Sequence, residues 1–157
     1  MENGSDQNSR SERLKILVCT AGPEPAGRMK KELARIADYF EADITVLKVL
    51  PHGSPIPADE LQNRGEKATG IIVDSLKEQG IEASSHLRFS DSTAKGIVET
   101  AEDLKVDLVI VGVGDKPSWL RKFIQGDVTE RVFHEAPCPV VALPRDIKRS
   151  PFAEVSK

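Results

Sequence analysis

Residues 106–113, VDLVIVGV, form the most apolar segment of the chain, and most of them are β-branched. A run of this kind predicts a strand that is covered on both faces, as at the centre of a parallel sheet. On both sides of this strand, short apolar runs alternate with segments whose apolar residues recur at helical spacing. The segment therefore predicts the middle of a sheet that the flanking sequence completes.

The alternation of the two patterns predicts the fold class. Strands are expected over residues 14–19, 44–50, 81–89, 106–113 and 138–143, and helices over residues 29–40, 61–80, 94–104 and 126–136. Strands that alternate with helices need crossover connections, which give a mostly parallel sheet with helices on both faces. Right-handed crossovers then produce an open, doubly wound α/β fold. In such a fold a ligand binds at the carboxyl ends of the strands, where the winding reverses.

Local signals refine the element ends. The pair Ser84-Ser85 weakens the third strand and Pro139 lies in the last one, so both strands are expected at sheet edges. Asp91 or Ser92 is expected to cap the helix over 94–104. Asp127, with Glu130 three residues later, is expected to cap the helix over 126–136.

Composition limits the classes of protein. The chain has 157 residues, 39% hydrophobic and 30% charged, and a net charge of −3, which is typical of one globular domain. The mild acidity argues against a nucleic-acid binder, and no apolar run is long enough to insert into a membrane. We expect a polar disordered leader over 1–13, a domain over 14–144 and a polar tail over 145–157.

The location expected from the sequence is the cytoplasm. The polar leader lacks the apolar core of a signal peptide. Cys19 and Cys138 are far apart and form no C-x-x-C pair, which favours a reducing compartment without a disulfide.

Searches for catalytic and metal motifs find no match. His52, His86 and His134 have no metal-type spacing, and no G-x-S-x-G nucleophile elbow occurs. Gly112 and Gly114 begin a G-x-G pattern, but Pro117 stands where the last glycine of a dinucleotide-binding turn is needed. The sequence therefore predicts no enzyme, no catalytic residue and no metal site.

The segment from Val111 to Pro144 resembles the universal stress protein family. The family signature is G-x2-G-x9-G-[S/T], followed by a V-[ST]-E-x-V helix and an A-P-C-P-V strand. Matching pieces are Gly112, Gly126, Val128-Thr129-Glu130-Arg131-Val132 and Ala136-Pro137-Cys138-Pro139-Val140-Val141. Further matches are Ile16-Leu17-Val18 with the turn from Gly22 to Pro25, and Leu47-Lys48-Val49, which resembles the L-H-V of the family's second strand. The resemblance covers about residues 14–144.

The resemblance implies a five-stranded sheet of order 3-2-1-4-5 and a homodimer that forms through the last strand. The dimer strand would comprise Val140, Val141, Ala142 and Leu143. ATP is the cofactor that the resemblance allows. The family's nucleotide-binding positions fall on Ala21, Val49, Gly112, Gly114, Gly126, Asp127, Val128 and Thr129. Val49 would contact the adenine through its backbone.

Several of these positions depart from the ATP-binding pattern of the family. Ala21 replaces an acidic residue, Asp115 replaces the second glycine, and Asp127 replaces the final serine or threonine. A phosphate needs free N–H groups, close backbone approach and no competing negative charge. These departures indicate degenerate and weak or lost ATP binding.

The loop before the last helix leaves an alternative open. Lys116, Arg121 and Lys122 can neutralise an anion, or they can form the solvated face of a short turn whose Trp119 points inward or meets a partner.

The sequence as a whole leaves three candidate functions. The first is a non-enzymatic stress-response protein that acts through unknown protein partners. The second is an ATP-binding switch or slow ATPase, and the third is a regulatory domain that docks on a membrane transporter or signalling protein.

Overall fold

The computed structural model describes residues 13–19, 27–113 and 126–144. The predictions for residues 1–12, Ala21, Gly114, the loop 115–124 and the tail 145–157 lie outside the described residues. In chain order the elements are β1 (Lys15–Cys19), α2 (Gly27–Phe40), β2 (Asp43–Pro51), α3 (Ala58–Glu78), β3 (Ala83–Ser90), α4 (Thr93–Leu104), β4 (Leu108–Val113), α6 (Gly126–Glu135) and β5 (Val140–Pro144).

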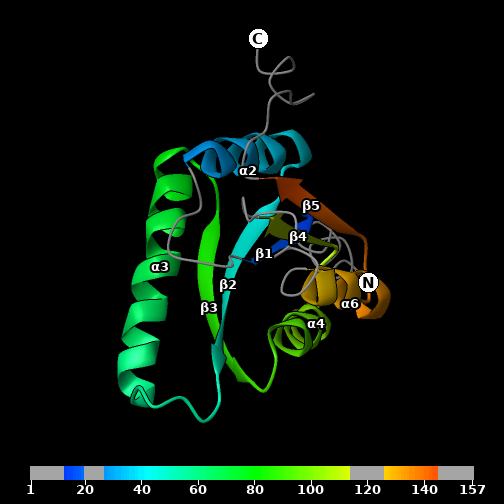
Figure 1. Cartoon of the computed structure of the whole chain (residues 1–157). Helices are drawn as coiled ribbons and strands as arrows, with labels where there is room; N and C mark the ends of the chain where they lie inside the picture. The colour runs from blue at the N-terminus through cyan, green and yellow to red at the C-terminus, as the bar shows by residue number, and fades with distance from the viewer. Residues whose placement is uncertain (1–12, 20–26, 114–125, 145–157) are drawn as a thin grey trace, which may run out of the picture.

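The strands form one five-stranded sheet in the order β3-β2-β1-β4-β5 (Figure 1). All neighbouring pairs are parallel, which confirms the doubly wound α/β fold and the strand order 3-2-1-4-5. β1 therefore lies at the centre, with β2 on one side and β4 on the other. Helices connect successive strands because a parallel pair cannot be joined by a tight turn.

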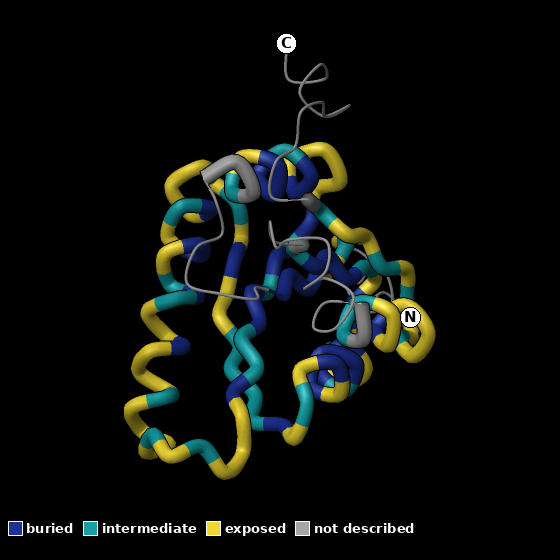
Figure 2. The backbone as a smooth tube through the Cα atoms, in the orientation of Figure 1, coloured by how far each residue is buried: buried dark blue, intermediate teal, exposed yellow. Residues whose placement is uncertain are grey.

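Each face of the sheet is covered by its own pair of helices. On one face, Leu33 of α2 and Ile72 of α3 pack with Val18 and Val46 of the sheet. On the other face, Val132 of α6 and apolar residues of α4 pack with Leu17, Leu47 and Val109 of the sheet. Figure 2 shows the buried backbone concentrated in the central strands and in the helix sides that face them. Because side chains alternate along each strand, successive strand residues belong to two separate cores, one on each face of the sheet.

The edge strands are β3 and β5, as the sequence indicated. β3 begins at Ala83, two residues later than expected, because the Ile81 N–H donates to the Leu76 carbonyl and prolongs the end of α3. β5 begins at Val140 and not at Cys138. The preceding Pro139 has no N–H, although its carbonyl accepts from the Val109 N–H at 3.0 Å.

The two predicted helix caps differ in outcome. Ser92 is the N-cap of α4, and its side chain accepts from the Lys95 N–H, which confirms one of the two expected caps. α6 begins at Gly126, so Asp127 is the second residue of that helix and not the residue before it. The Glu130 carboxylate lies 3.9 Å from His134 one turn later. Asp127 therefore lies within the first turn of α6 and not at the cap position, and its side chain is not among those that the structure describes.

Candidate functional site

The winding of the sheet reverses between β1 and β4. The chain passes from β1 through α2 to β2 on one side, and later returns through α4 to β4 on the other side of β1. At such a reversal the two connections leave in opposite directions, and the carboxyl ends of the strands border a crevice. The candidate site is therefore the carboxyl edge of β1, β2 and β4, together with the start of α6.

Cys19 closes β1 at this edge. It pairs in register with Leu47 of β2 and Val111 of β4, and it is 5% exposed. Burial raises the pKa of the Cys19 thiol, so the sulfur stays protonated and is a poor nucleophile. Burial, followed by the charge of Asp107, also raises the pKa of the Cys138 thiol. Both cysteines are free.

Val49 is held against the start of α4. A Cβ added at Gly96 of α4 would lie 2.7 and 2.9 Å from the two γ carbons of Val49 and 3.2 Å from the Ser90 Cβ. Gly96 therefore lets α4 approach the carboxyl half of β2, and the β-branched Val49 has little freedom to move. This contact fixes the strand backbone that is expected to face an adenine.

The structure brings part of the expected nucleotide site to one edge. Val49 lies near the end of β2 and Gly112 near the end of β4, while Gly126 opens α6. Val128 and Thr129 lie in the first turn of α6 and are half-buried. Ala21 and Gly114 lie outside the residues that the structure describes, and so does the side chain of Asp127.

An ionic chain beside the site was not predicted from the sequence. The His52 Nδ1 lies 2.8 Å from Asp91, and Lys95 of α4 lies within 4.0 Å of both Asp91 and Glu99. Arg88 of β3 continues the chain to Glu99 at 2.8 Å and Asp103 at 2.6 Å. His52 follows β2 and Asp91 follows β3, so only the pairing of these strands brings the two residues together.

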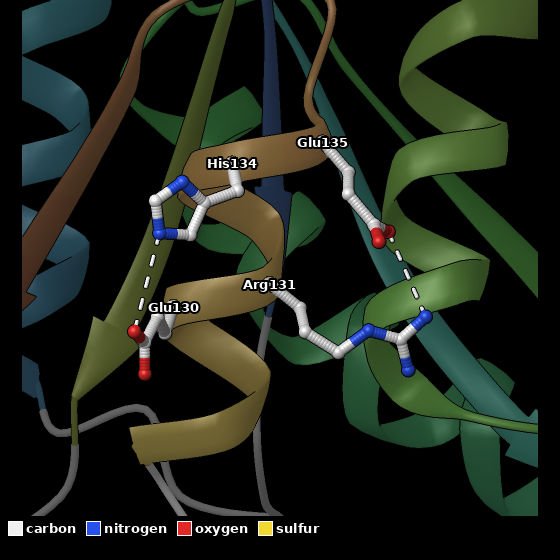
Figure 3. A pocket seen from close by; sticks show the side chains of 4 residues that line it. All are labelled: Glu130, Arg131, His134 and Glu135. Carbon is white, nitrogen blue, oxygen red and sulfur yellow. Dashed lines mark ion pairs between the residues drawn. The ribbon is translucent and has the colours of Figure 1, made fainter.

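A surface hollow of about 460 Å³ lies along α6 and is lined by Glu130, Arg131, His134 and Glu135. The four side chains project from one helix (Figure 3). His134 lies 3.9 Å from Glu130, and Arg131 forms an ion pair with Glu135 at 3.6 Å. This arrangement is typical of a solvated helix face.

Within residues 13–19, 27–113 and 126–144, no group of three or more histidine, cysteine or acidic residues is arranged to hold a metal ion. None of the helices that the structure describes is long and apolar enough to cross a membrane.

Comparison with known proteins decides the family. Residues 12–144 match the model of the universal stress protein family. The chain belongs to the universal stress protein family. A curated universal stress protein of Methanocaldococcus jannaschii, MJ0531, is 27% identical over an alignment of 157 positions. The alignment covers 93% of this chain and 91% of that protein. The chain is also 33% identical over 141 residues to the Na(+)/H(+) antiporter NhaS5 of Synechocystis, and the match covers 82% of this chain and 19% of the antiporter.

Solved universal stress proteins share the fold of the chain. One from Archaeoglobus fulgidus in complex with dAMP superposes with a TM-score of 0.63 at 20% identity and covers 83% of this chain and 98% of its own. A universal stress protein in complex with cAMP gives a TM-score of 0.65 at 18% identity, with coverages of 86% and 99%. At these identities the similarity establishes the architecture.

Proposed function

We propose that this universal stress protein is a non-enzymatic, cytoplasmic homodimer that acts in the stress response through protein partners. Its ATP binding is weakened or lost. The observation that carries the proposal is an aspartate, Asp127, in the first turn of α6 at the carboxyl edge of the sheet. The family pattern has a serine or threonine at this position.

The helix start explains why this one residue matters. The first N–H groups of a helix and its dipole attract an anion, and a triphosphate would use them here. An aspartate in the first turn supplies its own negative charge to these groups and repels the phosphate. Ala21 and Asp115 are two further departures from the family pattern, one a missing acid and one an additional acid.

Restoring the family residues tests the proposal. The double variant Ala21→Asp/Asp127→Ser is expected to bind Mg²⁺-ATP measurably by calorimetry, whereas the wild type shows no saturable micromolar binding. Glu130→Gln is the matched control, because it removes one exposed acid from the same helix outside the first turn. Saturable micromolar binding to the wild type that a Gly126→Trp substitution weakens would overturn the proposal.

A second candidate is an ATP-binding switch or slow ATPase. The solved relatives with dAMP and cAMP support it, as do Val49, Gly112, Gly126, Val128 and Thr129, which keep the family pattern in this chain. Lys116, Arg121 and Lys122 are then expected to neutralise the phosphates. Slow release of phosphate from ATP that stops on Gly126→Trp is the result that selects this candidate.

A third candidate is a regulatory domain that docks on a transporter or signalling protein. The similarity to a segment of the Na(+)/H(+) antiporter NhaS5 supports it. A pull-down that uses the purified chain as bait on separate membrane and cytosolic fractions tests it. Recovery of a transporter from the membrane fraction alone is expected for this candidate, and recovery of soluble partners alone contradicts it.

The dimer part of the proposal rests on β5. This strand pairs with β4 on one side, and its other side is an edge of the sheet. Val141 is 40% exposed, Ala142 is exposed, and Val140 and Leu143 are half-buried. An exposed edge strand with apolar side chains favours pairing with another copy of itself about a twofold axis.

A further inference from the structure

Two neighbouring aromatic side chains are exposed where α2 ends. Tyr39 is 55% exposed and Phe40 is 45% exposed, and their rings meet edge to face with centroids 5.0 Å apart. The apolar residues one turn earlier, Ile36 and Ala37, are buried in the core. Single exposed apolar residues are ordinary on a protein surface, but neighbouring exposed rings mark an interaction surface. Tyr39 and Phe40 (the aromatic pair) therefore form a surface that another segment can cover.

The same end of α2 carries negative charge. Asp38 and Glu41 flank the aromatic pair in the sequence and are exposed, and the last turn of the helix contains no basic residue. Among the described residues, no basic side chain forms an ion pair with either carboxylate. The carbonyl groups at a helix C-terminus add partial negative charge, which favours cations nearby. The surface therefore suits an occupant with both an aromatic ring and positive charge.

The sequence that follows β5 has this complementary composition. Residues 145–157 contain four basic and two acidic side chains. Three of the basic ones, Arg145, Lys148 and Arg149, precede Phe152. Opposite charges across a contact favour one partner over others, and a cation also binds over the face of an aromatic ring.

The position of β5 brings the start of this segment close to α2. Leu143 packs against the core to which Leu33 and Ala37 of α2 belong, and Figure 1 shows the end of β5 beneath α2. α2 has 14 residues, so its axis is about 21 Å long. The chain from Pro144 to Phe152 spans up to about 26 Å when it is extended. Phe152 can therefore reach the end of α2 within its own chain.

We propose that the segment 145–157 docks on the end of α2 in its own chain. The Phe152 ring covers the aromatic pair, and the basic side chains lie beside Asp38 and Glu41. Ring contacts of this kind add to the gain from apolar burial. The same segment of a second copy is the competing occupant, and the test separates the two. The inference goes beyond the proposed function, because it concerns neither the nucleotide positions nor the β5 edge.

Tyr39 makes the contact measurable. It is the one tyrosine of the chain, so protein labelled with ¹³C in tyrosine gives a single set of ring signals. Nuclear Overhauser effects are expected between the rings of Tyr39 and Phe152. Phe152→Leu keeps an apolar side chain and removes the ring, so it is expected to shift the Tyr39 signals. Phe133→Leu is the matched control, because Phe133 is an exposed aromatic residue of α6, the helix on the opposite face of the sheet.

Hydrogen exchange tests whether docking stabilises the helix end. The Ala42 N–H donates to the Ala37 carbonyl at 2.8 Å and closes the end of α2. Its exchange is expected to become roughly fivefold faster in Phe152→Ser, a change typical of one lost stabilising contact. The Gly80 N–H, which donates to the Lys77 carbonyl at the end of α3, is the control and is expected to keep its rate.

The inference is overturned if no contact between Tyr39 and Phe152 is detected in the wild type, or if Phe152→Leu leaves the Tyr39 signals unchanged. Equal exchange of the Ala42 N–H in the wild type and Phe152→Ser also contradicts it. A mixture of tyrosine-labelled and phenylalanine-labelled chains identifies the source of the segment. A ring contact between differently labelled chains would mean that a second copy supplies the segment, and this too contradicts the proposal.

Discussion

Gly96 controls how closely α4 approaches β2. A Cβ at this position would lie closer to the two γ carbons of Val49 than Cβ atoms come to other atoms in real proteins. Sequence periodicity places position 96 inside a helix but does not identify which glycine supports a close approach.

Gly96→Ala is expected to destabilise the protein by about 1–3 kcal/mol, because the new methyl group overpacks a rigid, β-branched neighbour. Gly70→Ala in α3 is the control, since nothing lies within 4 Å of the added Cβ. This control is expected to stabilise the protein by up to about 1 kcal/mol through helix propensity. Urea unfolding measures both changes, and equal effects of the two substitutions would contradict the packing argument.

Asp91 provides a pH-dependent prediction. The hydrogen bond from His52, then the charges of His52 and Lys95, hold the pKa of the Asp91 carboxyl below its usual value. Because the folded-state pKa is lowered, the stability from this interaction is present above the unfolded pKa of about 3.9. It is lost as the pH falls through the lower folded value.

His52→Gln is expected to raise the pKa of Asp91 towards the unfolded value in an NMR titration of side-chain carboxyl shifts. His134→Gln is the control, because His134 lies on α6 and pairs with Glu130. An Asp91 pKa that stays the same in His52→Gln would show that the His52 contact does not persist in solution.

At the scale of elements, Arg88 ties β3 to α4. Its guanidinium bonds Glu99 at 2.8 Å and Asp103 at 2.6 Å, one helical turn apart on α4. The Arg88 side chain is 26% exposed, so solvent screens these contacts only in part. The two bonds explain how α4 is anchored over β3, although β3 is an edge strand.

Arg88→Met is expected to lower the free energy of unfolding by about 1 kcal/mol, the upper range for a partly exposed ion pair. A double-mutant cycle with Asp103→Asn isolates the coupling between the two side chains. The control is Arg64→Met, whose ion pair with Glu60 is within α3 and more exposed. A coupling energy near zero for Arg88 and Asp103 would contradict the anchoring role.

The sequence predicts each element that the structure describes, and it errs only at their ends. The order of strands and helices follows from apolar periodicity, which burial imposes on both. The start of β3 depends on one backbone bond, from Ile81 to Leu76, and no side-chain pattern encodes it. The position of Asp127 also differs from the prediction, because α6 begins at Gly126, two residues earlier than a cap at Asp127 requires. Contacts between strands, such as His52 with Asp91, need the register and were missed.

At the scale of the whole molecule, the two edges of the sheet differ. At one edge, β3 is anchored through Arg88 to α4. At the other edge, β5 presents Val141 at 40% exposure, and Phe133 of the adjacent α6 is 49% exposed. This asymmetry favours β5 as the surface on which two copies meet.

Sedimentation velocity is expected to give twice the 17.2 kDa chain mass for the wild type and the single mass for Val141→Lys. The added lysines would face each other across the twofold axis and repel. Ile71→Lys is the matched control, because it changes an exposed isoleucine on α3, far from β5 in the fold. A monomeric wild type, or an unchanged dimer in Val141→Lys, would contradict the assignment of this edge.

The nucleotide content of the purified protein tests the central claim, weakened or lost ATP binding, most directly. The measurement is the ratio of absorbance at two ultraviolet wavelengths, followed by chromatography of a denatured extract. No ATP is expected in the extract of the purified protein. ATP released in an amount equal to the protein would contradict it.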